Sequence, residues 1–377
     1  MTRPFVDYYR ANAISPVNQD LSDVARHMER RESLYLALGI VPAFVAGRTV
    51  LEFGPGSGHN AIYTSSLRPR RYVLVDGNPV GLAAAGTLLD EYAPERDACV
   101  LVASLIEAYA SEERFDLVLC EGTIPGQLDP SFFARHAAGF VAAGGLFVLT
   151  AQDAASCLPE LVRRAVAAHV VPRSLPVQEQ LERLVPFFAP HLATLAGMSR
   201  PVADWVLDNI IQPYIGELFS VIEAIDVLAP DGLEVYNASP RFFTNWRWYK
   251  RQIGAERDLG PGVRASYRAN VVNMMDYRLD GAATHAPELG ERLLELADRF
   301  YDALREAEAG GSYATSIGLL RELAAAIRPV SVLTATSLDE ALAVCAAATA
   351  GSALPPTPAL SGFFGHGQQY LSFVRRA

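Results

Sequence analysis

Short apolar runs alternate with amphipathic stretches between residues 47 and 150. Val73-Leu74-Val75 and Leu117-Val118-Leu119 are apolar at consecutive positions, which is typical of strands covered on both faces. Five strands are predicted, at Thr49–Phe53, Tyr72–Asp76, Ala98–Ala103, Phe115–Cys120 and Gly145–Thr150. Asn78-Pro79 and Asp129-Pro130 each place proline directly after an N-cap residue, so a helix is expected to begin at each. This alternation predicts a doubly wound, mostly parallel α/β sheet.

The other parts of the chain are read mainly as helices. Residues 1–46 are expected to form an N-terminal helical arm, in which Leu21, Val24, Ala25 and Met28 share one face and charged residues fill the other. Residues 151–240 are expected to be a helical extension that ends in a return strand at 232–236. Residues 241–360 are expected to form a helical cap, with helices over about 286–328 and 338–349. Residues 361–377 are expected to supply a last strand that completes the sheet.

Composition excludes several classes of protein. Half of the residues are hydrophobic and 20% are charged, so the chain is not mainly disordered. The net charge of −10 argues against nucleic acid or an anionic membrane as partner, because the overall field repels phosphate. No apolar run approaches about 20 residues, and Met1–Phe5 lacks the apolar run of a signal peptide. We therefore expect a soluble, cytoplasmic protein.

The cysteines and histidines do not suggest a metal site. The cysteines form no CxxC pair, so they are expected to be reduced and buried. The seven histidines show neither HxxxH nor Cys/His ligand spacing, so no metal is expected. The cysteines are Cys99, Cys120, Cys157 and Cys345.

Three glycines follow the first predicted strand at alternate positions, in Glu52-Phe53-Gly54-Pro55-Gly56-Ser57-Gly58. A dinucleotide-binding GxGxxG motif would need glycine where His59 stands, and a P-loop would need a lysine that is not there. Glycines at these positions allow a sharp turn and let a ligand approach backbone N–H groups near a helix N-terminus. Asp76 ends the second strand, 18 residues after Gly58, where an acid can accept hydrogen bonds from ribose hydroxyls.

This loop and Asp76 together resemble motif I and the following acid of class I S-adenosylmethionine-dependent methyltransferases. The resemblance implies a Rossmann-like fold of seven strands, with 233–236 and 368–374 as the last two, and S-adenosylmethionine as cofactor. Ser104 stands where the family often has an acid for adenine, so Ser104 and the backbone of Leu105 are expected there. Segments 14–20 and 239–249 also resemble pieces of enlarged bacterial methyltransferases. The implied cofactor-binding residues are Glu52, Gly54, Pro55, Gly56, Gly58, Asn60, Asp76, Gly77, Asn78, Ser104, Leu105 and Glu121.

Four residues are candidates for catalysis at this edge of the sheet. Glu121 follows the fourth strand and is a candidate general base, or it holds the cofactor or a cationic acceptor. His59 opens a helix, where packing or a contact with the cofactor carboxylate is the alternative. His27 lies among charged residues, which favours a solvated helix face. His366 stands between two glycines near the last strand, where a loop histidine without a role is the alternative.

The run 241–252 carries four cationic side chains, five aromatic ones and no acid. It is read as an amphipathic element whose rings pack on the cap, as a site for a small anionic or sugar acceptor, or as a site for single-stranded RNA. The negative net charge disfavours RNA.

The preferred function is O-methylation of a small hydroxylated acceptor, such as a sugar or a sugar-linked compound. N-methyl transfer, aminopropyl transfer and an inactive cofactor-binding assembly protein stay open as alternatives. A homodimer also stays open.

Overall fold

The computed structural model describes residues 21–198, 200–212, 216–279 and 284–376. The chain divides into two compact units, one of residues 1–151, 215–264 and 369–377 and the other of residues 152–214 and 265–368. We call the first the sheet unit and the second the helical unit. The segment 14–20, which resembles other methyltransferases, lies outside the described residues.

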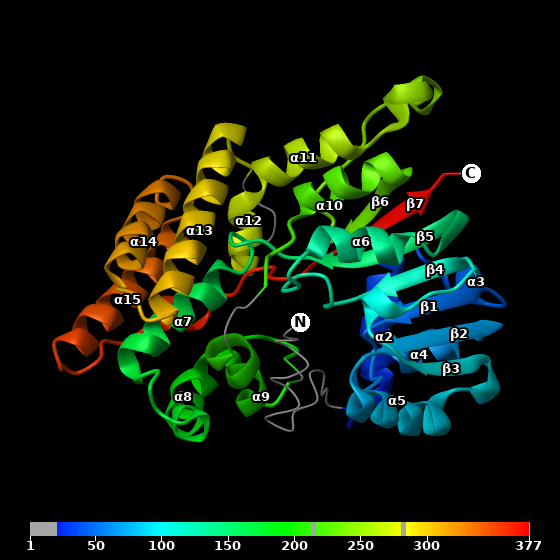
Figure 1. The fold of residues 1–377 in the computed structure, drawn as a ribbon. Helices are drawn as coiled ribbons and strands as arrows, with labels where there is room; N and C mark the ends of the chain where they lie inside the picture. The colour runs from blue at the N-terminus through cyan, green and yellow to red at the C-terminus, as the bar shows by residue number, and fades with distance from the viewer. Residues whose placement is uncertain (1–20, 199, 213–215, 280–283, 377) are drawn as a thin grey trace. The chain divides into compact units, whose positions relative to one another are not determined.

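The sheet unit contains seven strands in the order β3-β2-β1-β4-β5-β7-β6 (Figure 1). Strands β1 to β5 pair in parallel, and β7 pairs antiparallel with both β5 and β6. The predicted seven-stranded, mostly parallel sheet is thereby confirmed, including its last two strands, and the structure places β7 between β5 and β6. The strands are β1 Thr49–Phe53, β2 Arg71–Asp76, β3 Cys99–Ala103, β4 Phe115–Cys120, β5 Val141–Ala151, β6 Leu233–Ser239 and β7 Gln369–Arg375.

Both faces of the sheet are covered, as the continuous apolar runs predict. On one face Val50 and Leu117 belong to an apolar cluster with Tyr35. On the other face the ring of Phe53 lies 5.6 Å from that of Tyr109 and 5.8 Å from that of Phe140, measured between centroids. The α-helices of this unit are α2 Val24–Ala37, α3 Pro42–Val45, α4 Ala61–Ser66, α5 Pro79–Tyr92, α6 Pro130–Ala138 and α10 Val221–Leu228, and α11 Gly260–Ala269 runs from it into the helical unit.

Helix α2 buries more than its predicted face. Leu21, Val24 and Met28 of that face are half-buried, and Met28 packs against the apolar cluster. Ala25 is exposed, and the buried residues of α2 are His27, Arg31 and Tyr35. These three are spaced four residues apart, so they share a face of the helix. The expectation that the charged residues of this helix are solvated is therefore wrong for His27 and Arg31.

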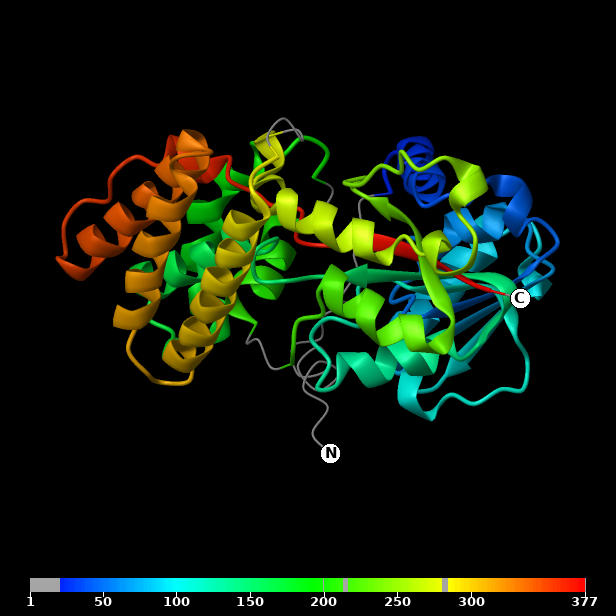
Figure 2. The same cartoon turned by 90° about the horizontal axis from the view of Figure 1, so that it is seen from above.

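The helical unit is a bundle in which α13, α14 and α15 run side by side (Figures 1 and 2). The predicted helix at 286–328 is two helices, because the chain turns at Gly310 and Gly311, the first with a φ of 108°. Helix α15 begins at Val332, before the expected start at 338. The α-helices are α7 Leu158–Val170, α8 Val177–Leu192, α9 Val202–Val206, α12 Val271–Met275, α13 Pro287–Glu308, α14 Ala314–Ile327, α15 Val332–Thr349 and α16 Pro358–Ser361.

A buried arginine joins distant segments of the helical unit. Arg163 on α7 donates hydrogen bonds to the carbonyl oxygens of Phe363 (2.6 Å) and Leu360 (3.0 Å), and its guanidinium lies 4.0 Å from the ring centroid of Phe364. The segment 360–364, which precedes β7, is thereby fixed onto α7.

Within the described residues, α15 is the one helix whose length and composition would allow it to cross a membrane. It contacts α7, α14 and α16, which are contacts of a helix inside a packed bundle.

One buried hydroxyl connects β7 to its neighbours, and it provides a test of the sheet. Ser372 Oγ donates to the carbonyl oxygen of Leu38 (2.8 Å) and accepts from the backbone N–H of Asn237 (3.1 Å). We expect Ser372→Ala to lower the free energy of unfolding by about 1–3 kcal/mol, because two buried backbone groups lose their partner. Thermal or urea unfolding followed by circular dichroism measures the change. Ser33→Ala, at an exposed position of α2, is the control, and equal losses in both variants would contradict the role given to Ser372.

Candidate functional site

Parallel pairing brings the ends of four strands to one edge of the sheet. Phe53 pairs with Val75, Asp76 with Ala103, and Glu52 with Leu119. The residues that follow β1, β3 and β4, and Asp76 at the end of β2, therefore lie along one edge. Ligands of open α/β sheets bind outside the carboxyl ends of the strands.

The glycine loop after β1 turns through backbone conformations that favour glycine. Gly54, Gly56 and Gly58 have φ values of 68°, 55° and 82°. A Cβ added to Gly58 would lie 2.7 Å from Cα of Ala85, and one added to Gly81 would lie 3.1 Å from the carbonyl oxygen of Gly56. Helix α5 therefore packs directly against the loop, and only glycine permits this approach.

Asp76 connects the glycine loop to the start of α5. One carboxylate oxygen accepts from the backbone N–H of Gly56 (3.0 Å), and the other accepts from that of Asn78 (2.7 Å). Burial raises the pKa of Asp76, while these two hydrogen bonds lower it. A carboxylate has about four acceptor positions, so the two backbone bonds fix its orientation and leave positions for the two hydroxyls of a ribose. This donor set fits a nucleoside cofactor.

The predicted adenine residues lie beside Asp76. The backbone N–H of Ser104 donates to the carbonyl oxygen of Asp76 (3.2 Å). Ser104 Oγ donates to the carbonyl oxygen of Leu105 (2.9 Å). A Cβ added to Gly77 would lie 2.7 Å from Cδ2 of Leu105. An apolar side chain and a hydroxyl therefore stand next to the acid expected to hold the ribose.

Three further residues expected to bind the cofactor stand at the loop or at a helix start. Pro55 is buried in the glycine loop. Asn60 directly precedes α4, and the side chain of Asn78 caps α5 by accepting from the N–H of Val80 (3.1 Å). Their contacts with a cofactor stay predictions.

Glu52 lies beneath this edge, where its carboxylate accepts a hydrogen bond from the hydroxyl of Tyr72. Its exposed fraction is 4%. Burial raises the pKa of Glu52 to about 7, and the charge of Glu121 contributes. Its expected role at the cofactor therefore stays a prediction.

Glu121 forms a bidentate ion pair with Arg31 of α2. The two N···O distances are 2.8 and 2.7 Å, and the side chains are 7% (Arg31) and 8% (Glu121) exposed. The guanidinium also lies 5.3 Å from the ring centroid of Tyr35. Burial, with the nearby charge of Glu121, raises the pKa of Tyr370 on β7 to about 12. Arg31 of α2, Glu121 after β4 and Tyr370 of β7, from three distant segments, thus lie near one another at this edge.

Arg31 is not among the site residues predicted from the sequence. The available signal was the four-residue spacing of His27, Arg31 and Tyr35, which puts three polar or aromatic side chains on one helix face. Because the adjacent residues are charged, the pattern resembles a solvated helix face. Only the pairing of Arg31 with Glu121 shows that this face is buried.

The structure brings His27 and His59 together. Nε2–H of His27 donates to the carbonyl oxygen of His59 (2.8 Å), and Nδ1 of His59 lies 2.7 Å from Oγ of Ser57. Burial lowers the pKa of both rings, and the charge of His27 lowers that of His59 further. Both imidazoles are thereby favoured as neutral near pH 7.

His366 belongs to the helical unit. Its backbone N–H donates to the carbonyl oxygen of Met274 (2.8 Å). Burial lowers the pKa of His366, and the charge of Asp276 raises it. A catalytic role for His366 stays a prediction.

The aromatic and basic run after β6 is exposed. The exposed fractions of Trp246, Trp248 and Tyr249 are 92%, 61% and 70%. In the structure these rings are not packed, which differs from the expectation of an amphipathic element that covers its aromatic face.

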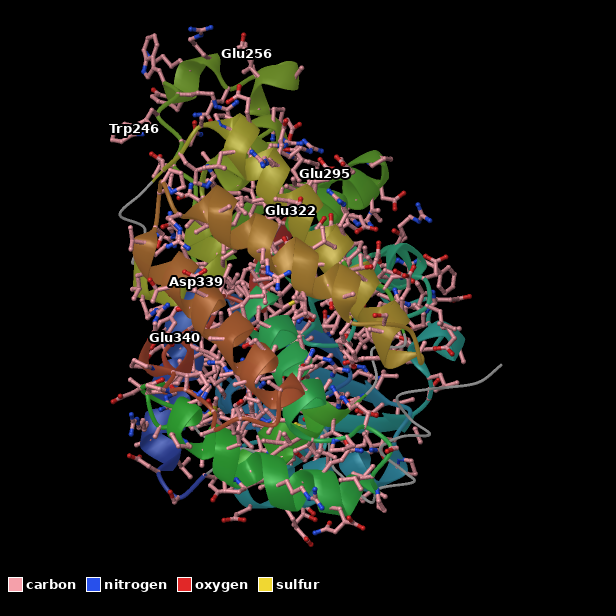
Figure 3. All side chains as sticks on the ribbon, turned by 90° about the vertical axis from the view of Figure 1, so that its left-hand side faces the viewer. Trp246, Glu256, Glu295, Glu322, Asp339 and Glu340 are labelled. Atoms are coloured by element: carbon pink, nitrogen blue, oxygen red, sulfur yellow. The ribbon has the colours of Figure 1, made fainter. Side chains whose placement is uncertain are left out.

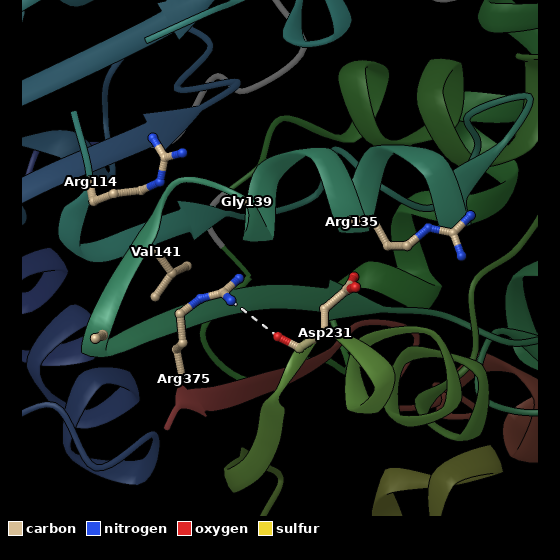
Figure 4. A pocket seen from close by; sticks show the side chains of 7 residues that line it. Arg114, Arg135, Gly139, Val141, Asp231 and Arg375 are labelled. Carbon is tan, nitrogen blue, oxygen red and sulfur yellow. Dashed lines mark hydrogen bonds between the residues drawn. The ribbon is translucent and has the colours of Figure 1, made fainter. Parts of the chain in front are cut away.

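A basic hollow lies at the opposite edge of the sheet, where β4 and β5 begin. It has a volume of about 530 Å³ and is lined by Arg114, Arg135 and Arg375, among others. Arg375 donates to the carbonyl oxygen of Asp231 (3.1 Å), as Figure 4 shows, and to that of Ala138 (2.9 Å). This hollow is separate from the glycine loop and Asp76.

Among the residues that the structure describes, no group of three or more His, Cys, Asp or Glu side chains could hold a metal ion.

The part of the chain that forms this edge of the sheet is similar to a known protein family. Residues 24–196 match a family model described as a methyltransferase domain. The match begins at α2, so it includes Arg31 as well as the glycine loop and Asp76. A search of curated proteins found no match.

Solved methyltransferases show partial similarity. The CcbJ methyltransferase from Streptomyces caelestis is 23% identical over 34% of this chain and 50% of its own, with a TM-score of 0.29. The N-methyltransferase NodS from Bradyrhizobium japonicum, in complex with S-adenosyl-L-homocysteine, is 20% identical over 39% of this chain and 74% of its own (TM-score 0.32). The magnesium protoporphyrin IX methyltransferase from Synechocystis is 12% identical over 65% of this chain and 93% of its own (TM-score 0.38). This chain thus spans half the length of CcbJ.

Asp76→Ala tests the nucleoside site. We expect the variant to bind S-adenosylhomocysteine about 1–3 kcal/mol more weakly, or about 5–150-fold in Kd, because charge-assisted hydrogen bonds are lost. Isothermal titration calorimetry measures Kd. Asp90→Ala, at an exposed position of α5 where the acid pairs with half-buried Arg96, is the control. Unchanged affinity in a folded Asp76→Ala protein would refute the assignment.

Proposed function

We propose that the chain, which matches a methyltransferase-domain model through residues 24–196, is a class I S-adenosylmethionine-dependent methyltransferase that methylates a hydroxyl group of a small, uncharged acceptor such as a sugar. The family defines the donor and the reaction class. The acceptor and its reacting atom are our inference from the residues around Glu121.

On the donor side, the glycine loop and Asp76 fit the cofactor, which supplies an electrophilic methyl group when bound. The backbone of Gly54, Gly56 and Gly58 would hold its amino-acid part. Asp76 would hold the ribose, and Ser104 with Leu105 would border the adenine. Transfer of a methyl group is an in-line displacement, so alignment of donor and acceptor supplies much of the rate gain.

The observation that carries the acceptor class is the bidentate ion pair between Arg31 and Glu121. Three buried or half-buried acids at this edge have partners within the described chain: Glu52 has Tyr72, Asp76 has two backbone N–H groups, and Glu121 has Arg31. A cationic amine or polyamine needs a carboxylate that is not already neutralised, since a buried ammonium without an opposite charge is costly. This supports a neutral, hydroxylated acceptor over an amine.

A hydroxyl acceptor must lose a proton as it is methylated, and His59 is the residue we assign as base. Its imidazole follows the glycine loop directly, and burial lowers its pKa, so the ring is ready to accept a proton. His27 holds the backbone of His59 through its carbonyl oxygen. We assign His27 a positioning role, because its Nε2–H is already engaged there.

The test of the proposed function is methyl transfer from radiolabelled S-adenosylmethionine to a panel of small acceptors, half polyols and sugars and half primary amines of matched size. We expect label in the hydroxylated half, at a rate at least tenfold above the amines. Asp76→Ala protein, which should bind the donor more weakly and so label either half more slowly at limiting donor, is the matched control. Preferential labelling of amines would show an N-methyltransferase. Tight S-adenosylhomocysteine binding without turnover on either half would favour an inactive binding protein.

The pH dependence of the reaction tests the base. Because burial lowers the pKa of His59 below its usual 6.5, the base stays neutral above that pH and is lost only as pH falls further. We therefore expect kcat/KM on a hydroxyl acceptor to be flat from pH 8 down to about the usual histidine pKa of 6.5 and to fall only at lower pH. His59→Gln should lower kcat about 10²- to 10⁴-fold and remove the acid limb. His136→Gln, on α6, should keep both the rate and the limb, and a wild-type profile in His59→Gln protein would exclude His59.

A further inference from the structure

The basic hollow at the edge where β4 and β5 begin is not used by the proposed function. Its arginines come from three segments that the fold brings together: Arg114 precedes β4, Arg135 lies on α6, and Arg375 ends β7 (Figure 4). All three segments belong to the sheet unit. Because the glycine loop and Asp76 lie at the carboxyl ends of the parallel strands, the hollow is at the other edge of the sheet and is a separate candidate site.

The charges that line the hollow are mostly positive. Three arginines and one acid, Asp231, line it, so the lining carries +2. Helix α6 ends at Ala138, and its C-cap Gly139 also lines the hollow. The C-terminus of a helix contributes only about half a negative charge, so a positive excess of about one and a half charges remains.

Acidic side chains close to the hollow along the chain do not neutralise this excess. Three of them pair with arginines outside the lining, and Glu112 is exposed and does not line the hollow. Among the described residues, no ion pair involves an arginine of the lining. The three pairs are Glu113–Arg71 (3.1 Å), Asp116–Arg48 (3.6 Å) and Glu234–Arg376.

The acidic character of the chain is located elsewhere. The net charge is −10, and residues 287–349 of the helical unit contain ten acidic and five basic side chains. Figure 3 shows Glu295, Glu322 and Asp339 among these acids. A concave surface lined by one sign of charge raises the local concentration of ions of the opposite sign, so the hollow favours an anion although the chain as a whole is acidic.

Backbone carbonyl oxygens hold two of the three guanidinium groups in place. Arg375 donates to Asp231 (3.1 Å) and Ala138 (2.9 Å), and Nη1 of Arg114 donates to the carbonyl oxygens of residues 111, 112 and 113 (3.2, 3.2 and 3.1 Å). A guanidinium has five N–H donors, so each keeps donors for a ligand. Nε of Arg375 is buried and has no hydrogen-bond partner in the described part of the chain. Groups that are oriented before a ligand binds lower the entropic cost of binding.

The size and the remaining lining of the hollow indicate more than a single small ion. Its volume of about 530 Å³ lies within the roughly 300–1,000 Å³ of small-molecule sites. Val141 and Ala143 give it an apolar wall beside the arginines. Such a lining fits a molecule that has a charged group and an organic part.

We propose that the basic hollow binds a phosphoryl group, with the arginines on its oxygen atoms and the organic part of a phosphate ester against Val141 and Ala143. A planar guanidinium donates two parallel hydrogen bonds to phosphate oxygens. A phosphate monoester carries about −1.5 to −2 near pH 7, which matches the positive excess of the lining, whereas a carboxylate carries only one charge.

Isothermal titration calorimetry tests this site without reference to methyl transfer. The probe is glycerol 3-phosphate, and S-adenosylhomocysteine is present throughout so that the cofactor site is not titrated. We expect glycerol 3-phosphate to bind and glycerol not to bind. Because the charges face solvent, affinity should fall when salt rises from about 0.05 to about 0.5 M.

Substitutions in the lining should change Kd in opposite directions according to charge. Arg375→Gln should raise Kd about tenfold or more, because charge-assisted hydrogen bonds are lost. Arg135→Gln should raise it about two- to fivefold and Asp231→Asn should lower it about two- to fivefold, since both side chains are exposed. Arg321→Gln, at an exposed position of α14, is the matched control and should leave Kd unchanged. Opposite changes at Arg135 and Asp231 do not arise from a loss of fold, so they keep the test decisive if Arg375→Gln is unstable.

Inorganic phosphate distinguishes the two sources of the phosphoryl group. Tighter binding of glycerol 3-phosphate than of inorganic phosphate would identify a phosphate ester as the ligand, and equal affinity would identify free phosphate. Binding of neither anion, equal binding of glycerol, or a Kd that stays the same in both Arg135→Gln and Asp231→Asn would overturn the proposal.

Discussion

The ion pair between Arg31 and Glu121 is the interaction on which the arrangement of the candidate site depends. Both side chains are almost fully buried, and breaking a buried pair by removing one partner costs about 3–5 kcal/mol. The pair joins α2, which precedes the sheet, to the end of β4 at its centre. Helix α2 is therefore a wall of the site, although it lies outside the alternating strands and helices that form the nucleotide-binding core.

The same helix face connects α2 to the glycine loop and to α4. His27 donates to the carbonyl oxygen of His59, and the Tyr35 hydroxyl lies 2.6 Å from Oγ1 of Thr64. Three polar contacts at successive turns thus place α2 against the loop, and a single contact of this kind would leave the helix free to rotate. The cost of burying these three side chains is largely offset because each makes a hydrogen bond, although Nε of Arg31 has no partner. This arrangement fixes Glu121 relative to Asp76.

The sequence predicts the donor half of the site because that half is local. Gly54 directly follows β1 and Asp76 ends β2. Because these strands are neighbours and parallel, the positions of the two residues along the chain predict that they lie close together. The order of the strands is equally predictable, since parallel strands with short crossovers have few arrangements. Arg31 could not be predicted in this way. Its partner is 90 residues away, and nothing in the local pattern distinguishes an arginine that binds a buried acid from one that faces water.

The role of the aromatic run after β6 could not be predicted from the sequence for a similar reason. Alternating rings and cationic side chains are equally compatible with packing, with a ligand site and with a protein interface, because composition alone does not say which surface is covered. The exposure of the rings in the structure argues against packing alone: Trp246 faces solvent while Arg247 is engaged with backbone carbonyl oxygens. Arg247 thus fixes the conformation of the loop while the tryptophans stay uncovered. These residues maintain the shape of the loop and do not bury it.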